Sequence, residues 1–204
     1  MKIGVCLPYM KAGMTRSDYH AWFRRIEEGP FHALSCGERI MGPAMDMRVL
    51  LAAAATLTER VEINTTLYVL PMHNAVRAAK EIATLDIMCD GRLTVTVGYG
   101  GRPHDYEAVG AEWRGRHARM DEQVATMRSV WRQEPLFEGV EPVGPVPLRP
   151  EGPRLLTGAM GPKGMARSAQ WADGVYAWSG NGEQHEVENT LALADAKWKD
   201  AGRD

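Results

Sequence analysis

The sequence predicts an α/β fold in which helices cover a parallel sheet. Short apolar segments with strand periodicity alternate with longer segments of helical periodicity about six times along the 204 residues. Strands that alternate with helices pair in parallel, because each helix returns the chain to the same end of the sheet. A closed eight-unit barrel and an open doubly wound sheet both satisfy this pattern. In either fold the ligand lies at the carboxyl ends of the strands.

The segment from Gly91 to Gly101 shows this plan most clearly. Leu93, Val95 and Val97 alternate with threonines, which is the period of a strand. A glycine-rich loop follows at Gly98, where the backbone can approach a ligand closely. Similar patterns predict strands at Lys2–Leu7, Phe31–Cys36, Val61–Leu67, Arg154–Thr157 and Gly174–Ala177.

Helical periodicity predicts the segments between these strands. The first helix follows the capping sequence Thr15–Asp18, and the others cover Met47–Leu57, Val76–Met88, Met120–Arg132, Lys163–Gln170 and Glu183–Ala201. The range Pro135–Pro153 contains six prolines and breaks the alternation. We interpret it as an extended excursion within a single domain spanning residues 1–204, with a short strand near Leu136–Glu138. A linker between two domains is the alternative.

Composition narrows the class of protein. A net charge of −2 gives no electrostatic reason to expect nucleic acid or an anionic membrane as partner. The three cysteines have neither metal-binding nor disulfide spacing, so we expect a reducing cytoplasm. No H-x-x-x-H, H-E-x-x-H or C-x-x-C motif is present, so we expect no metal site. No apolar run approaches the roughly 18 residues of a membrane span.

Two glycine-rich loops are the candidate ligand sites. Gly158–Gly164 joins a strand to a helix, where free backbone N–H groups and the helix dipole favour a phosphate, and Lys163 could add a charge. A plain strand-to-helix turn is the alternative. In the loop Gly98–Gly101, a flat ring could lie against the glycine backbone, with Tyr99 or Arg102 binding an anion. A simple turn with a solvated arginine is the alternative.

Four polar side chains in the predicted carboxyl-end loops could act on a substrate. Glu38 and Arg39 follow the second strand directly; they could meet a substrate or form an ordinary surface ion pair. His73 and His104 are the histidines of these loops, and either could act as a general acid or base. A solvated loop histidine is the alternative for each.

The run from Val61 to Gly110 resembles the bacterial luciferase-like family of flavin- and deazaflavin-dependent oxidoreductases. The residues that carry this resemblance continue beyond the run to the sixth strand. They are Leu70-Pro71, Ala79-Lys80-Glu81, Ala83-Thr84-Leu85-Asp86, Gly91-Arg92-Leu93, Gly98-Tyr99-Gly100, Tyr106, Gly110, Arg116, Asp121-Glu122, Met127-Arg128, Trp131, Gly158, Gly161-Pro162 and Ala172-Asp173-Gly174.

The resemblance implies a TIM-type (β/α)₈ barrel with a flavin at the carboxyl ends of the strands. It places the cofactor phosphate at Ala159, Met160, Gly161 and Gly164, in agreement with the glycine-loop argument. It places the ring system against Thr65, Thr66, Leu67, Gly98 and Tyr99, with Trp178 closing the pocket; Gly100 and Gly158 belong to the same loops. Because Thr65 and Thr66 point to opposite faces of their strand, one of them should face the cavity.

This chain departs from the family pattern in two respects. Luciferases and several deazaflavin dehydrogenases carry a catalytic histidine after the second strand, where this chain has Glu38-Arg39. Deazaflavin sugar-phosphate enzymes carry a glutamate after the strand-four glycines, where this chain has Gly101. Both departures argue against light emission and sugar-phosphate oxidation. The catalytic residues cannot be transferred from the family, so Glu38, Arg39 and His73 stand as candidates.

A further departure concerns length. Such a barrel takes about 250 residues or more, so we expect the barrel to be C-terminally incomplete, with about six units and exposed edges at the first and sixth strands. We therefore expect either a portion of a longer protein or a chain that associates, as a homodimer or oligomer. The expected function is oxidation–reduction of a small organic substrate by hydride transfer or oxygen activation, with FMN or coenzyme F420. A non-catalytic or degenerate flavin-binding barrel is the alternative.

Overall fold

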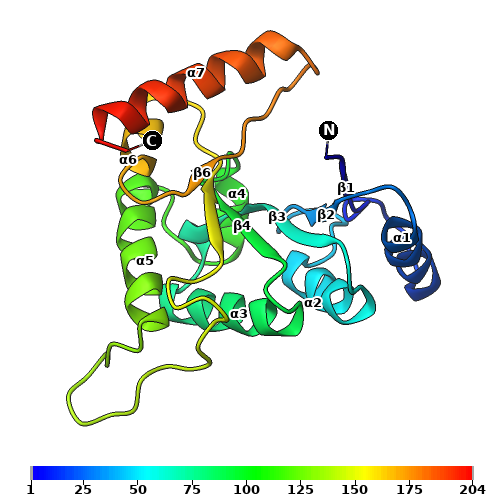
Figure 1. Cartoon of the computed structure of the whole chain (residues 1–204), viewed down its shortest axis with the longest axis horizontal. Coiled ribbons are helices and arrows are strands. Elements are labelled where there is room, and N and C mark those ends of the chain that lie inside the picture. Colours follow the sequence, from blue (N-terminus) through cyan, green and yellow to red (C-terminus); the bar gives the residue numbers. More distant parts are fainter. Residues whose placement is uncertain (1, 204) are drawn as a thin grey trace.

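Six parallel strands form one sheet whose spatial order follows the sequence, from β1 to β6. The computed structural model describes residues 2–203, and Figure 1 shows an arc of helices around its strands. The strands are β1 (Gly4–Cys6), β2 (Ala33–Cys36), β3 (Glu62–Tyr68), β4 (Leu93–Val97), β5 (Arg154–Thr157) and β6 (Gly174–Val175). The helices are α1 (Arg16–Glu28), α2 (Met47–Leu57), the 3₁₀ turn η1 (Leu70–Met72), α3 (Ala75–Met88), α4 (Pro103–Ala108), α5 (Arg116–Trp131), α6 (Pro162–Ser168) and α7 (Gln184–Asp200).

The strand order decides between the two folds that the sequence left open. A doubly wound sheet reverses its order at a switch point, whereas here each strand is added on the same side of the preceding one. Crossovers of one hand then place the connecting helices on one face of the sheet, as in a (β/α) barrel. The described sheet is thus a six-stranded portion of barrel wall, with β1 and β6 at its edges.

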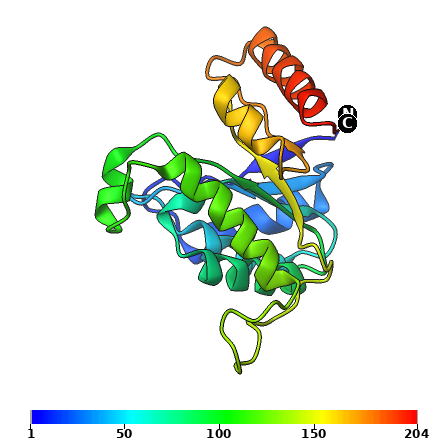
Figure 2. The same cartoon turned by 90° about the vertical axis from the view of Figure 1, so that its left-hand side faces the viewer.

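The helix-covered face of the sheet is apolar. Ile63, Val95 and Leu155 lie on this face, and each is at most 1% exposed. Figure 2 views the arrangement from the side of α5, whose buried residues pack toward the sheet and α3. Trp131 at the end of α5 is buried, and its Nε1 donates to the carbonyl oxygen of Ala79 at 3.0 Å. This packing holds the strand ends, and hence their loops, in fixed register.

The predicted elements are present, with bounds shifted by a few residues. Met47–Leu57 and Arg154–Thr157 have the predicted bounds, whereas β1 and β6 are shorter than predicted. The short strand expected near Leu136–Glu138 is wrong, because residues 133–153 contain no helix or strand. Contacts with α3 hold this excursion instead: Lys80 Nζ donates to the oxygen of Gly144 at 2.7 Å, and the amide of Leu148 donates to Asp86 Oδ2 at 2.9 Å. Within residues 2–203, no helix combines the length and hydrophobicity needed to cross a bilayer.

Candidate functional site

The carboxyl ends of the six strands surround one cavity of about 480 Å³, which we call the central cavity. Parallel strands bring these ends together at one edge of the sheet, as the sequence predicted. Every strand contributes through its last residues or the following loop. The lining residues are Tyr9, Glu38, Thr66, Leu67, Val69, Met72, Tyr99, Gly100, Gly101, Arg102, Asp105, Tyr106, Gly158, Met160 and Trp178.

A second cavity of about 470 Å³ adjoins the first at the start of α6, and we call it the α6 cavity. Tyr99, Gly158 and Met160 line both cavities. The other lining residues are His117, Ala159, Gly161, Lys163, Gly164 and Arg167. The two predicted glycine-rich loops therefore meet at one composite site, with Tyr99 on the shared boundary.

The glycines make this site possible in two different ways. A Cβ on Gly98 would stand 2.7 Å from Cδ2 of Leu67, and a Cβ on Gly158 would stand 2.6 Å from the same atom. The Leu67 side chain therefore leaves no room for a side chain at either position. A Cβ on Gly161 would meet no atom within 4 Å, so the space there is open. The backbone of Gly161 is extended, with φ −97° and ψ 156°. Its lack of a side chain therefore leaves room for a ligand rather than for other protein atoms.

Tyr99 presents an unused hydroxyl to this site. Its Oη is buried and makes no well-formed hydrogen bond within the described residues. Burial raises the pKa of this hydroxyl, and the nearby Ser168 hydroxyl lowers it by a smaller amount. Its ring lies 4.3 Å from the ring of His117, and its Cε2 is 3.4 Å from where a Cβ on Gly164 would stand. The carbonyl of Tyr99 accepts a 2.6 Å bond from the hydroxyl of Tyr106. A buried polar group without a partner is costly, so a ligand that bonds this hydroxyl would gain affinity.

Positive charge gathers around the α6 cavity. Arg167 forms an ion pair with Asp121 at 2.5 Å. Lys163 also lines the cavity, and it forms no ion pair in the part of the chain that the structure describes. Burial lowers the pKa of His117 below its ordinary value, and the charges of Arg116 and Arg167 lower it further. A bound anion would raise the pKa of this imidazole and so favour its protonated form. The cavity thus suits a phosphate group.

Glu38 and His73 form a buried pair that the sequence did not predict as a pair. Nε2 of His73 lies 2.7 Å from Oε1 of Glu38, and the side chains are 13% and 4% exposed. Oε2 of Glu38 accepts the backbone N–H of Val69 at 2.7 Å. Glu38 lines the central cavity, whereas His73 lies behind it.

Besides His73 and Gly98, three predicted candidates line neither cavity. Thr65 is 2% exposed and faces α2 and α3, where its hydroxyl bonds both the N–H and the carbonyl of Thr96. Arg39 donates its Nε–H to the oxygen of Met41 at 2.9 Å and does not line either cavity. His104 has an 85% exposed side chain beside Glu107. The remaining cofactor candidates, with Thr66 as the cavity-facing threonine, line one or both cavities or, as Gly98 does, underlie them.

Sequence reasoning missed several lining residues. Tyr9, Met72, Asp105 and His117 line the cavities but were not among the candidates. The six-residue helix α4 carries Asp105 and Tyr106 into the site. Pro103 at the first position of α4 was a usable signal, since proline is favoured there.

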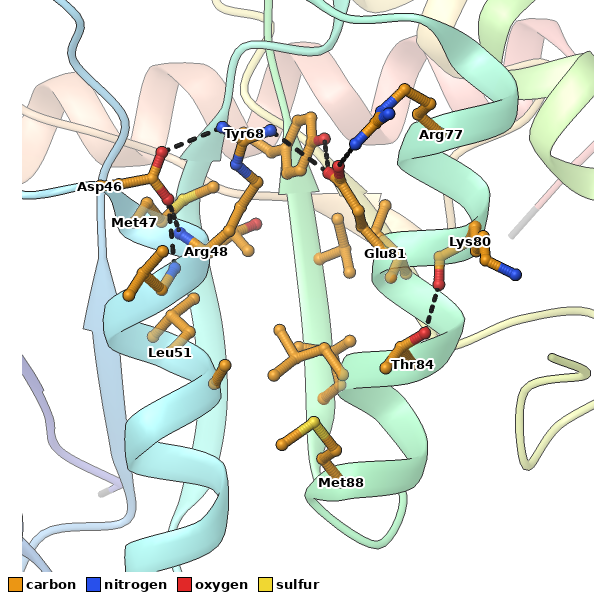
Figure 3. Close-up of a pocket in the computed structure, with 17 residues that line it drawn as sticks. Asp46, Met47, Arg48, Leu51, Tyr68, Arg77, Lys80, Glu81, Thr84 and Met88 are labelled. Carbon is orange, nitrogen blue, oxygen red and sulfur yellow. Dashed lines mark hydrogen bonds and ion pairs between the residues drawn. The ribbon is translucent and has the colours of Figure 1, made fainter. Parts of the chain in front are cut away.

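A cavity larger than either of these lies elsewhere, on the outer face between α2 and α3. Figure 3 shows this groove of about 640 Å³, with an apolar floor and charged groups at one end. Those charges are already matched: Arg48 contacts Asp46 at 2.9 Å and Glu81 at 3.3 Å, and Tyr68 donates to Glu81 at 3.2 Å. Neither glycine-rich loop borders this groove, so the carboxyl-end site is the better candidate.

Comparison with known sequences identifies the family of this chain. Residues 1–204 match the family described as luciferase-like monooxygenase. An uncharacterized protein of Mycobacterium tuberculosis is 30% identical over 167 residues, which are 78% of this chain and 58% of that protein. The F420-dependent glucose-6-phosphate dehydrogenase of Kribbella flavida is 29% identical over 166 residues, which are 75% of this chain and 48% of that protein. The chain thus spans about half the length of the curated relatives it matches.

Solved structures show the same fold. The monooxygenase RslO1 of Streptomyces bottropensis superposes with a TM-score of 0.83 at 26% identity, covering 100% of this chain and 68% of that one. The oxygenating constituent of 3,6-diketocamphane monooxygenase from Pseudomonas putida, in complex with FMN, gives a TM-score of 0.82 at 17% identity, covering 100% and 64%. The family match covers the whole sequence and the solved structures share the fold, so the chain belongs to the luciferase-like monooxygenase family.

Proposed function

We propose that this chain forms the cofactor-binding part of an oxidoreductase that uses FMN or coenzyme F420 on a small organic substrate. The observation that carries the proposal is the composite site, in which a cationic cavity adjoins an aromatic one across Tyr99. FMN and F420 share this division, because each joins a flat tricyclic ring to a phosphate. The names of two relatives support it: one is F420-dependent, and another structure holds FMN.

The described residues fit such a cofactor. The phosphate would lie in the α6 cavity, near Lys163, the open space at Gly161 and the free hydroxyl of Tyr99. The ring would lie in the central cavity, against the backbone of Gly100 and the side chain of Leu67. When bound, the cofactor supplies hydride transfer or oxygen activation, while the protein orients the substrate and excludes water.

Binding and turnover test the proposal separately. FMN and F420 are each titrated into the purified protein and followed by absorbance, since the two ring systems absorb at different wavelengths. The reduced form of the tighter ligand is then mixed with oxygen or with carbonyl compounds, and its reoxidation is followed. Binding with catalysed reoxidation supports an oxidoreductase, and binding alone supports the non-catalytic alternative. If neither cofactor binds, the proposal is wrong.

A further inference from the structure

The Glu38–His73 pair is a buried ionisable pair that borders the central cavity and has no role in the cofactor fit above. Glu38 follows β2 and His73 follows η1, so the pair joins two loops that are 35 residues apart in sequence. The backbone oxygen of His73 accepts a 2.6 Å bond from Nε2 of Gln123, and its ring meets the ring of Tyr68 edge-on at 4.8 Å. These contacts fix the imidazole behind the carboxylate.

The carboxylate keeps capacity for a ligand. Each of its oxygens accepts one hydrogen bond in the structure, Oε1 with His73 and Oε2 from Val69. A carboxylate oxygen can accept two, so a substrate hydroxyl could bond Glu38 without displacing either partner. The neighbouring ionisable groups are Tyr68 on β3, Tyr106 on α4 and Cys36 at the end of β2. Burial raises the pKa of each, and the charge of Glu38 raises it further.

We propose that Glu38 exchanges the substrate proton in a reaction between an alcohol and a carbonyl compound, and that His73 is its positioning residue. In the oxidative direction, the alcohol carbon loses a hydride to the oxidised flavin or deazaflavin. The alcohol O–H loses its proton to the carboxylate of Glu38, and the carbonyl compound leaves. This inference rests on the proposed function, which supplies the hydride acceptor.

His73 holds the carboxylate in the orientation that faces the cavity. With its Nε2–H donating to Oε1, the imidazole stabilises the carboxylate, so removing it changes how readily Glu38 takes up the substrate proton. A pair that only joins the two loops would affect stability and leave the pH dependence of catalysis unchanged. That difference makes the two roles separable.

The experiment compares two carboxylate–histidine pairs in the same chain. Glu38→Gln and Glu38→Asp alter the buried pair. Glu107→Gln alters the solvent-exposed pair of Glu107 with His104, whose side chains are 82% and 85% exposed. His73→Gln tests the positioning residue. Cofactor dissociation constants, thermal unfolding and single-turnover reduction of the bound cofactor by cyclohexanol and 2-propanol are measured for each protein between about pH 5 and 9.

The expected pattern separates the pair from its controls. Glu38→Gln should bind cofactor within about twofold of the wild type and reduce it about 100-fold more slowly, the lower end for loss of a general base. Glu38→Asp should retain part of the rate, Glu107→Gln all of it, and His73→Gln should shift the pH profile of the rate.

Two results would overturn the inference, and they are distinguishable. In the first, the Glu38→Gln variant folds, binds cofactor and reduces it at a rate within a few-fold of the wild type. That result would leave the proposed function intact and show that Glu38 has no part in it. A wild-type protein that binds neither cofactor, or binds without reduction by any alcohol, would remove the proton-exchange step altogether. If Glu38→Gln unfolds, the Glu38→Asp and His73→Gln pH profiles decide: unchanged profiles contradict the inference.

Discussion

Cδ2 of Leu67 lies 2.6 Å from the position that a Cβ on Gly158 would occupy. The same side chain also blocks a Cβ on Gly98, at 2.7 Å. One leucine at the end of β3 thus fills the space that two glycines leave at the ends of β4 and β5. The peptide bond between Thr66 and Leu67 is cis. In this part of the cavity wall, the Leu67 side chain occupies the space that side chains at positions 98 and 158 would need.

Gly158→Ala should force Leu67 to move and should destabilise the protein by about 1–3 kcal/mol, as overpacking does. Leu67→Ala should relieve that clash. In a double-mutant cycle measured by urea unfolding, the pair should show a coupling of more than about 0.5 kcal/mol, the level above which residues in contact depart from additivity. Additive effects would mean that Leu67 does not adjust to Gly158.

Gly161→Val should leave stability unchanged within about 0.5 kcal/mol, because a Cβ there meets no atom within 4 Å and the backbone is already extended. The valine would instead fill the space assigned to the phosphate. We expect FMN affinity to fall by about tenfold or more, equivalent to about 1.4 kcal/mol, while riboflavin, which lacks the phosphate, binds as before.

Gly101→Val is the matched control for Gly161→Val. It also has open space around it, but it lines the central cavity. It should weaken FMN and riboflavin to the same extent. If Gly161→Val weakens both ligands equally, the phosphate does not lie in the α6 cavity.

The sequence predicted the strands and the meeting of the glycine loops, because both follow from local periodicity and from parallel pairing. It predicted that Thr65 and Thr66 point to opposite faces, but not which one faces the cavity. Alternation fixes the relation between neighbours, and only tertiary packing decides the face. The Glu38–His73 contact was beyond reach for the same reason, since no local rule relates side chains 35 residues apart.

Neutral alcohols should be better substrates than phosphorylated ones. The side chains of Glu38 and Asp105 line the central cavity, and both are buried. Arg102 is the one arginine among the lining residues, and it is exposed. Like charges placed together cost several kcal/mol, so we expect kcat/KM for cyclohexanol to exceed that for glucose 6-phosphate by about 100-fold or more. Unphosphorylated glucose serves as the control for size and hydroxyl content. Efficient turnover of the sugar phosphate would contradict this placement of charge.

Cofactor binding should depend on the protonation of His117. Burial, and the charges of Arg116 and Arg167, hold the pKa of this imidazole below its ordinary value of 6.5, opposed by Asp121. A phosphate in the α6 cavity adds negative charge and raises that pKa, so the complex binds more protons than the free protein. The extra affinity is present at low pH and is lost as pH rises through the pKa of His117 in the complex.

The phosphate of FMN also titrates, near about pH 6, so the wild type alone is insufficient to test this dependence. His117→Gln keeps a polar side chain and removes the titration. The dissociation constant for FMN, measured by fluorescence from about pH 5.5 to 8.5 to span the ordinary histidine pKa, should rise more steeply with pH in the wild type than in His117→Gln. Riboflavin should show no such difference between the two proteins. Parallel FMN profiles would show that His117 does not sense the phosphate, and that Lys163 and Arg167 carry the charge of the α6 cavity.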